Sequence, residues 1–157
     1  MQAMARKTAG ILLYRFREGR LEVFLVHPGG PFWAKKEQAA WSIPKGEFGD
    51  PEDPIEAARR EFREETGVSV NGDFIELGAI KQSGGKTVYA WALAGDCDPE
   101  AIQSNSFQMQ WPPKSGTYQS FPEVDRAAWF DLQTAREKIH KGQAAFLDRL
   151  AGQLGLA

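Results

Sequence analysis

Apolar and branched residues form two runs near the start of the chain, with a polar turn between them. The runs span Thr8 to Phe16 and Leu21 to His27, and the turn is Arg17-Glu18-Gly19-Arg20. Short branched runs around a polar turn of this kind are typical of a β-hairpin. The pattern therefore predicts two adjacent strands at the beginning of the fold.

The segment after this hairpin has a different composition. Pro28 to Ala40 is rich in turn-forming residues but also contains aromatic ones, more than a solvated connector needs, and we expect it to border a ligand. Trp41-Ser42-Ile43 is a short apolar run that ends at Pro44. Gly, Pro and acidic residues then predict a loop from Lys45 to Asp53.

The clearest helix signal comes next. Asp53 is a good N-cap, Pro54 suits the first helical turn, and Glu56 stands where a capping box requires an acid. Gly67 directly follows Thr66 and supplies a stop signal. These signals predict a helix of about three turns between Asp53 and Gly67.

This helix has an apolar face and an acidic face. Glu61, Glu64 and Glu65 fall at positions i, i+3 and i+4, so their carboxylates project from one side of the helix. We expect that side to lie opposite the apolar face. The apolar face carries Ile55, Ala58 and Phe62.

Further strands and helices follow along the chain. Phe74 to Gln82 and Lys86 to Ala94 flank Ser83-Gly84-Gly85, a tight hairpin signal. Gln103 to Pro122 indicates one short strand and then a long Pro-bearing loop, and Ala127 to Phe130 indicates another strand. Leu132 to Leu154 fits either one helix interrupted near Gly142 or two short helices. The fold class is therefore α+β, with helices on a mixed sheet.

Composition limits the kind of protein further. A chain of 157 residues with 42% hydrophobic and 25% charged residues is expected to form a single domain over residues 1–157. Cys97 is the only cysteine, so no disulfide is expected within the chain, and we expect a cytoplasmic location. The apolar run Ile11 to Leu13 is too short for a signal peptide or a membrane span.

The charge balance makes an extended nucleic-acid or membrane interface unexpected. Lysine and arginine number 19 against 21 acidic residues, and the net charge is −2. Such a chain has no overall field that would hold a nucleic-acid backbone or an anionic membrane. Any binding of phosphate must therefore be local.

The acidic face predicts a metal site. Carboxylates so close together repel one another, and a compensating cation is expected. A carboxylate cluster without His or Cys suits a hard divalent ion, Mg²⁺ above all and Mn²⁺ as a substitute. Mg²⁺ is usually shared with substrate phosphates, so the cluster predicts hydrolysis of a phosphate compound, with Lys45 placed to contact a phosphate.

A defined motif contains these acids and resembles the Nudix box. The box reads G, five residues, E, seven residues, then R-E-apolar-x-E-E-x-G-apolar, which is a specific signal. Every defined position is matched, by Gly46, Glu52, Arg60, Glu61, Phe62, Glu64, Glu65, Gly67 and Val68.

The resemblance to Nudix hydrolases implies both a fold and a site. It implies an α/β/α sandwich around a mixed sheet and metal-dependent hydrolysis of a nucleoside diphosphate linked to another group. Glu52, Arg60 and Gly67 take structural roles in the motif, the first two by pairing with each other. The implied metal ligands are Gly46, Glu61, Glu64, Glu65 and Glu123, of which the four glutamates are also the implied catalytic residues.

Segments outside the box resemble one branch of that family. Trp41 to Gly46 is similar to the W-x-x-P-K-G segment of diadenosine polyphosphate hydrolases, and Lys86-Thr87-Val88 is similar to a K-T-V segment of their animal-type members. Glu123, six residues before Trp129, matches an additional metal-binding or catalytic glutamate. The residues expected to bind substrate are Lys45, Lys86, Tyr89 and Trp33, the two aromatic ones by stacking on a base.

The expected substrate is therefore a small nucleotide, a dinucleoside polyphosphate such as diadenosine tetraphosphate that is cleaved to AMP and ATP. Two alternatives remain open: pyrophosphohydrolysis of a nucleoside triphosphate or of an RNA 5′ end, and nucleotide sensing without turnover. The proline after the box that marks many ADP-ribose pyrophosphatases is absent, and so is the motif of coenzyme A hydrolases. No membrane partner is expected, and the oligomeric state is left open.

Overall fold

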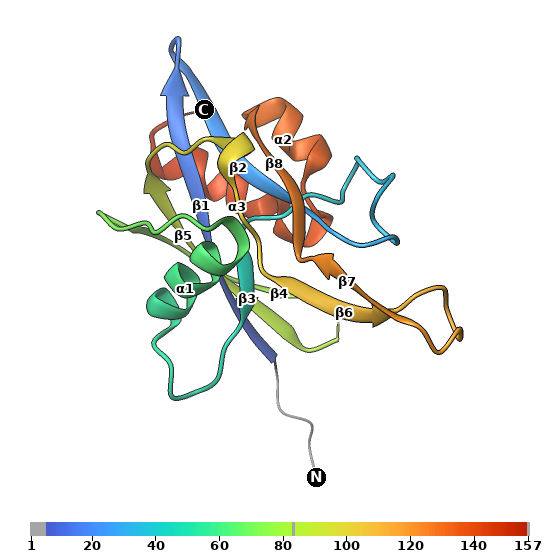
Figure 1. Cartoon of the computed structure of the whole chain (residues 1–157). Coiled ribbons are helices and arrows are strands. Elements are labelled where there is room, and N and C mark those ends of the chain that lie inside the picture. The colour runs from blue at the N-terminus through green and yellow to red at the C-terminus, as the bar shows by residue number, and fades with distance from the viewer. Residues whose placement is uncertain (1–5, 83, 157) are drawn as a thin grey trace.

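A mixed β-sheet forms the centre of the computed structural model, which describes residues 6–82 and 84–156 (Figure 1). Its strands are β1 (Arg6–Arg17), β2 (Arg20–Pro28), β3 (Lys45–Glu47), β4 (Ile75–Gln82), β5 (Lys86–Ala94) and β8 (Val124–Asp131). The order is β4-β5-β1-β2-β8, with β3 also paired to β1. β1 runs parallel to β5 and antiparallel to β2 and β3.

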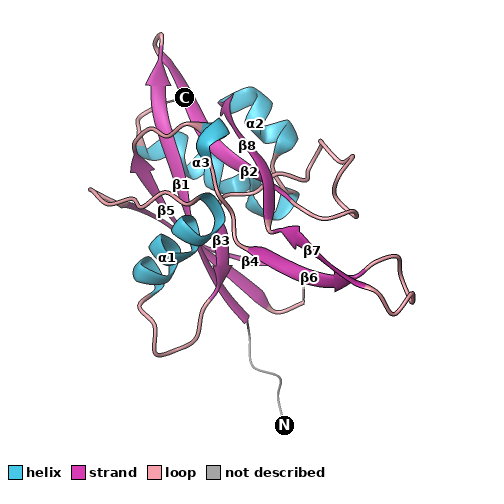
Figure 2. Cartoon of the chain, viewed as in Figure 1, coloured by secondary structure: helices cyan, strands magenta, loops and turns pink. Residues whose placement is uncertain are grey.

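Helices cover both faces of this sheet (Figure 2). α1 (Pro54–Thr66) packs on one face, and α2 (Leu132–Lys138) and α3 (Ala144–Gln153) pack on the other. Alternate residues of β1 serve the two sides: Ile11 and Leu13 face α1, whereas Leu12 and Tyr14 belong to the core under α2 and α3. The predicted α/β/α sandwich is confirmed.

The predicted ends of α1 are confirmed, and one detail is wrong. The Asp53 side chain accepts a hydrogen bond from the Ile55 amide at 3.3 Å, and Gly67 ends the helix at φ 78°. Glu56 does not form the expected capping box, because its carboxylate accepts hydrogen bonds from Arg59 at 3.1 Å. Phe62 is fully buried and packs against Phe24, which fixes α1 on the sheet.

Replacing the N-cap of α1 should lower stability modestly. Asp53→Ala removes the side-chain acceptor of an otherwise unpaired helical amide, and we expect a loss of about 1 kcal/mol in the free energy of unfolding. Urea denaturation measures this loss. Asp53→Asn, which keeps an acceptor oxygen, should lose less than half as much, and equal losses in the two variants would contradict the capping role.

One edge of β1 is shared by two strands. β2 pairs with β1 over Tyr14–Arg17, and β3 pairs with it over Thr8–Gly10, so β2 leaves β1 where β3 begins. β3 lies inside the segment predicted to be a loop, Lys45 to Asp53, and that part of the prediction is wrong. A three-residue strand of Lys, Gly and Glu has no apolar pattern, and only its pairing with β1 makes it a strand.

The chain between β5 and β8 also differs from its prediction. After a short 3₁₀ turn, η1 (Pro99–Ala101), β6 (Ser106–Gln110) and β7 (Tyr118–Pro122) pair as an extended two-stranded arm. Only the first of these strands was expected, because Tyr118 to Pro122 lacks an apolar run. Phe107 of β6 packs with Phe121 of β7 within the arm, and Trp111 packs with Phe32, which lies between β2 and β3.

The C-terminal part forms two helices, the second of the two predicted alternatives. α2 ends at Lys138, a 3₁₀ turn η2 (Lys141–Gln143) follows, and α3 begins at Ala144. Ser83, in the predicted turn between β4 and β5, lies outside the described residues. None of the helices in the described ranges is long and apolar enough to cross a membrane.

Candidate active site

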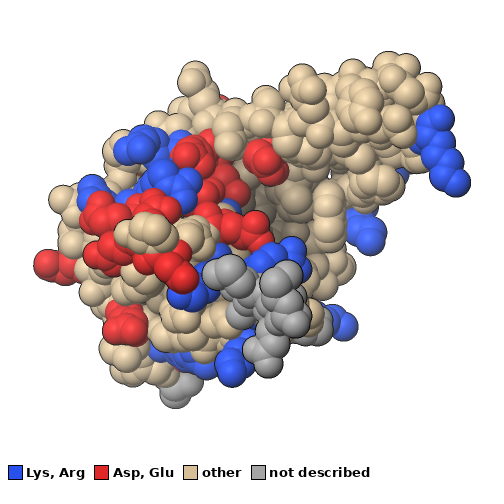
Figure 3. Space-filling view, turned by 90° about the horizontal axis from the view of Figure 1, so that it is seen from below, with Lys and Arg blue, Asp and Glu red and all other residues tan. Residues whose placement is uncertain are grey.

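The glutamates of the motif line one cavity together with Glu123. This cavity, which we call the acidic cavity, has a volume of about 440 Å³. It lies between β3, α1 and the chain just before β8. Figure 3 shows acidic side chains gathered on this side of the molecule, with lysine and arginine beside them. The residues around the cavity are Lys45, Gly46, Glu47, Glu61, Glu64, Glu65, Asn105 and Glu123.

The acidic side of α1 was predicted to lie opposite the apolar side, and this prediction is wrong. The two sides lie next to each other. Glu65 lies seven residues after Ala58, so after almost two full turns it returns to nearly the same line along the helix. Glu65 is therefore partly buried, and its carboxylate accepts a hydrogen bond from the backbone amide of Lys45 at 3.1 Å. Its position at the edge of the core ties the helix to β3.

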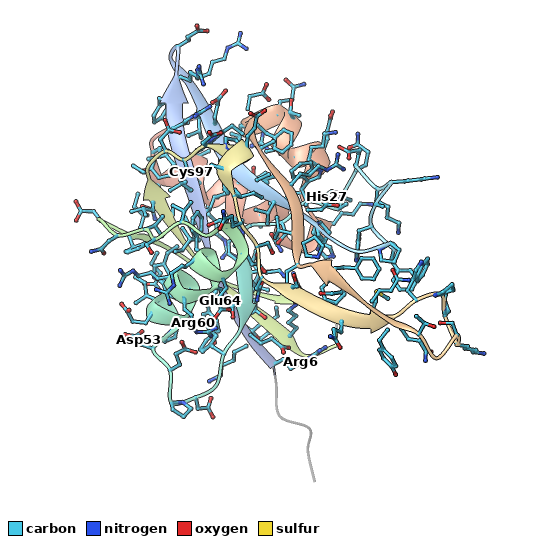
Figure 4. The ribbon with its side chains drawn as sticks, viewed as in Figure 1. Arg6, His27, Asp53, Arg60, Glu64 and Cys97 are labelled. Atoms are coloured by element: carbon cyan, nitrogen blue, oxygen red, sulfur yellow. The ribbon has the colours of Figure 1, made fainter. Side chains whose placement is uncertain are left out.

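Arg60 holds three of the acidic side chains. It donates two hydrogen bonds to Glu52, at 2.8 and 2.9 Å, so the pair implied by the family resemblance is present. Its Nη1 also donates to Glu61 at 2.8 Å and to Glu64 at 3.2 Å. Arg60 and Glu64 lie side by side on α1 in Figure 4. Arg60 thus joins the loop before α1 to the acidic cavity.

The pKa values of two of the glutamates are raised. Burial raises the pKa of Glu61, and the nearby Glu64 carboxylate raises it further, against the opposing effect of Arg60. Burial also raises the pKa of Glu65 to about 8, although Lys45 opposes the shift. Carboxyl groups with pKa values raised in this way would be stabilised in their charged form by a cation.

These residues fit a hard divalent cation by their chemistry. The cavity offers carboxylate and amide oxygens and no thiol or imidazole, which is the ligand set of Mg²⁺ or Mn²⁺. In the conformation described for residues 6–82 and 84–156, no three His, Cys, Asp or Glu side chains are grouped around one ion position. Glu61 and Glu64 are instead bonded to Arg60, and binding a metal would require these oxygens to turn from the guanidinium.

The raised pKa of Glu65 predicts a pH dependence of stability without metal. The folded protein keeps this proton up to pH about 8, whereas the unfolded chain loses it near 4.5, so stability falls as pH rises between these values. In EDTA, the melting temperature should fall less with pH in Glu65→Gln than in the unmodified protein. Identical slopes from pH 5 to 8 would contradict the shift.

Gly46 is required by the shape of the cavity. A Cβ atom at this position would lie 2.0 Å from the carboxyl carbon of Glu61, a distance that no side chain can occupy. The absence of a side chain at Gly46 therefore leaves the space that the Glu61 carboxylate fills. Gly46 borders the acidic cavity between Lys45 and Glu47, and its role as a metal ligand stays a prediction.

A second cavity, of about 230 Å³, lies beside the first, and we call it the basic cavity. It brings together three of the four predicted substrate-binding residues: Trp33, Lys45 and Lys86. A smaller cavity, which contains Lys45, Glu65 and Glu123, lies between it and the acidic cavity. Lys45 borders all three cavities, so they adjoin one another, and we refer to the three together as the depression.

Tyr89 is not part of this depression. Successive residues of β5 point to opposite faces of the sheet, and Tyr89 lies on the side of α1, where its ring packs against Phe48 at 6.1 Å between centroids. Its predicted role in stacking on a base finds no support in this position. A tyrosine three residues after Lys86 is on the wrong face to join it.

Sequence reasoning did not identify Asn105 and His140 as site residues. The backbone amide of Asn105 donates a hydrogen bond to the backbone carbonyl of Glu64 at 2.9 Å. The backbone carbonyl of Asn105 accepts one from the backbone amide of Glu123 at 2.8 Å. Asn105 therefore fixes Glu123 relative to α1 and also borders the acidic cavity. His140 borders the basic cavity from the turn after α2. Neither residue has a local sequence signal, because both reach the site through tertiary contacts.

A cavity of about 720 Å³ lies at the other end of β1, away from the glutamates of the motif. Arg15 stacks on Trp129 there, with its guanidinium carbon 4.1 Å from the ring centroid, and it donates to Asp96. Burial raises the pKa of the nearby Cys97 thiol to about 11, which disfavours the reactive thiolate at neutral pH.

Comparisons with known proteins place this arrangement in context. Residues 4–150 match the family model described as NUDIX domain. The fold is similar to an Ap4A hydrolase from C. elegans solved as a binary complex, with 22% identity, a TM-score of 0.64, and coverage of 96% of this chain and 98% of that one. No curated protein sequence matched.

Two other solved structures share the fold. The NUDIX domain of NrtR from Shewanella oneidensis, complexed with ADP ribose, has 17% identity, a TM-score of 0.67, and coverage of 98% of this chain and 90% of that one. RenU, a Nudix hydrolase from M. smegmatis, has 20% identity, a TM-score of 0.60, and coverage of 96% and 86%.

Proposed function

The chain belongs to the Nudix family, whose hydrolases act on phosphoanhydride bonds, and from this premise we propose that it cleaves a dinucleoside polyphosphate such as diadenosine tetraphosphate to AMP and ATP. We propose Mg²⁺ as its cofactor, with Mn²⁺ as a substitute. The observation that carries the substrate assignment is the position of Lys45, which borders both the acidic and the basic cavity.

A long phosphate chain suits this depression better than a short one. The acidic cavity needs cations between its carboxylates and any phosphate, whereas the basic cavity offers Lys45 and Lys86 directly. A substrate with several consecutive phosphates can occupy both cavities at once. A nucleoside diphosphate linked to an uncharged group offers less charge to the lysines.

The acidic residues would hold the metal. Glu61, Glu64 and Glu65 supply carboxylate ligands, and Gly46 a backbone oxygen; Glu123 adds a ligand or takes the proton of the attacking water. When bound, the metal polarises the phosphate and lowers the pKa of water. Arg60 and Glu52 keep the loop before α1 in place, and Lys45 orients the phosphate chain beside Glu65.

Trp33 borders the basic cavity, with 37% of its surface exposed. The centroid of its ring lies 5.3 Å from the Lys36 ammonium. We propose that this ring stacks on a base of the substrate. The products would be small nucleotides, which suits a cytoplasmic enzyme, and the single cysteine agrees with that compartment.

A comparison of substrates tests the assignment. The purified protein is incubated with Mg²⁺ and, separately, with diadenosine tetraphosphate, ATP, ADP-ribose and a triphosphorylated RNA, and kcat/KM is measured for each. The proposal predicts the highest value for diadenosine tetraphosphate, with AMP and ATP in equal amounts. Pyrophosphate released preferentially from ATP or RNA would instead assign the triphosphate reaction, and binding without any product would assign nucleotide sensing.

A further inference from the structure

The basic cavity carries basic side chains from three separate parts of the fold. Lys45 comes from β3, Lys86 from β5, and His140 from the turn between α2 and η2. Gln82, at the end of β4, adds an amide to the same lining. Among the described residues around this cavity there is no carboxylate, which contrasts with the acidic cavity beside it.

The hydrogen bonding of His140 leaves a donor for a ligand. Its Nδ1 accepts a hydrogen bond from the Gly142 amide at 3.0 Å, so in the neutral ring the proton is on Nε2. Gln82 lies next to this turn, because a Cβ on Gly142 would be 2.6 Å from the Gln82 amide nitrogen. The turn therefore brings an imidazole and an amide together.

The two lysines disfavour the protonated form of His140. Burial lowers the pKa of His140, and Lys45 and Lys86 lower it further. Burial and Lys45 lower the pKa of Lys86, while Glu47, which is paired with Arg6 at 3.8 Å, acts in the opposite direction. Positive charges held together in this way are stabilised by an anion with several oxygens.

We propose that His140 is a further phosphate-binding residue in this cavity, where it acts beside Lys45 and Lys86 in a subsite for phosphoryl groups that needs no metal. The inference rests on the proposed function: phosphates that are not attacked lie between Lys45, Lys86 and His140 while the scissile bond lies at the carboxylates. His140 donates its Nε2 hydrogen to a phosphate oxygen. Gln82 donates from its amide, and Trp33 borders the same cavity.

Binding to this subsite takes up a proton. A bound phosphate group offsets the positive field of Lys45 and Lys86, so the pKa of His140 rises when the subsite is filled. The affinity for phosphate compounds should therefore increase as pH falls from 7.5 to 6. The titratable groups that act on His140 are these two lysines.

Inorganic triphosphate in EDTA provides the test, because it lacks a nucleoside and no metal is available. Its affinity is measured by calorimetry for the unmodified protein and for His140→Asn, His140→Gln and Lys86→Met. Asn keeps an oxygen near the position of Nδ1, and so the bond to Gly142, but lacks the Nε2 donor. Gln places its amide nitrogen near Nε2. Lys81→Met is the matched control, since Lys81 is an exposed lysine on β4 outside the cavity.

The expected results separate a binding role from a structural one. Lys86→Met should bind triphosphate at least tenfold more weakly and His140→Asn about fivefold more weakly, with His140→Gln close to the unmodified protein and Lys81→Met unchanged. The His140 ring resonance should titrate at higher pH with triphosphate bound. Equal affinity in all variants, or an unchanged titration of His140, would overturn the proposal.

This test does not depend on turnover. If diadenosine tetraphosphate is not cleaved but triphosphate binding shows the expected pattern, the substrate assignment fails and the subsite stands. If the substrate is cleaved as proposed and His140→Asn binds triphosphate normally, the subsite fails and the hydrolase stands. Melting temperatures of the variants show whether each one is folded.

Discussion

Glu65→Gln should hydrolyse substrate at least about 10³-fold more slowly than the unmodified protein, a loss of ~4 kcal/mol of transition-state stabilisation. The amide keeps the shape of the side chain and can still accept the hydrogen bond from the Lys45 amide. It cannot supply a negative charge to a divalent cation. The activity loss should therefore come without loss of the fold.

Stability measurements distinguish this effect from damage to the protein. Burial keeps Glu65 protonated at neutral pH in the absence of metal, with a pKa of about 8. A neutral amide should therefore leave the melting temperature in EDTA at pH 7 unchanged or slightly higher. Glu56→Gln is the matched control on the same helix, because Glu56 is exposed and pairs with Arg59, and it should retain full activity. More than a tenth of normal activity in Glu65→Gln would contradict the assigned role.

Gly46→Ala should reduce kcat by about 10²-fold, because a displacement of a catalytic group by about 1 Å costs activity on this scale. The added Cβ would lie 2.0 Å from the carboxyl carbon of Glu61, so that carboxylate has to move. Steady-state kinetics at saturating Mg²⁺ measure the effect. Some loss of stability should accompany it, since β3 pairs with β1 at this residue.

Gly49→Ala is the control for this prediction. Gly49 lies in the same loop region, and a Cβ there would meet only the Pro51 side chain, at an ordinary 3.5 Å. It should therefore keep normal kcat. If both glycine variants were equally active, the space beside Glu61 would not matter for catalysis.

The part of the site that the sequence predicts is encoded locally. The N-cap at Asp53, the stop at Gly67 and the spacing of the glutamates all depend on contacts within a few residues, and the structure has them as expected. The family pattern adds Gly46, whose small size is needed only because Glu61 packs against it. Local signals and one motif were therefore enough to predict α1 and the glutamates on it, but not where their side of the helix lies relative to the core.

The remaining features depend on contacts between distant segments. β3 is a strand only because β1 leaves an edge open beside it, and β7 is a strand only because β6 pairs with it. His140 enters the site because the α2–η2 turn reaches the end of β4. The separation of Tyr89 from Lys86 could not be predicted, because the face of β5 on which Tyr89 lies follows from the sheet, and neither composition nor spacing reveals that face.

The central claim is that the acidic cavity hydrolyses a phosphoanhydride bond with a bound divalent cation. Incubation with diadenosine tetraphosphate in ¹⁸O-labelled water, followed by mass spectrometry of the products, tests it most directly. We expect AMP and ATP, with a single ¹⁸O atom in a phosphate of one of them, in the presence of Mg²⁺, and no product in EDTA or with Glu65→Gln. Turnover that persists in EDTA, or that Glu65→Gln supports equally, would contradict the account.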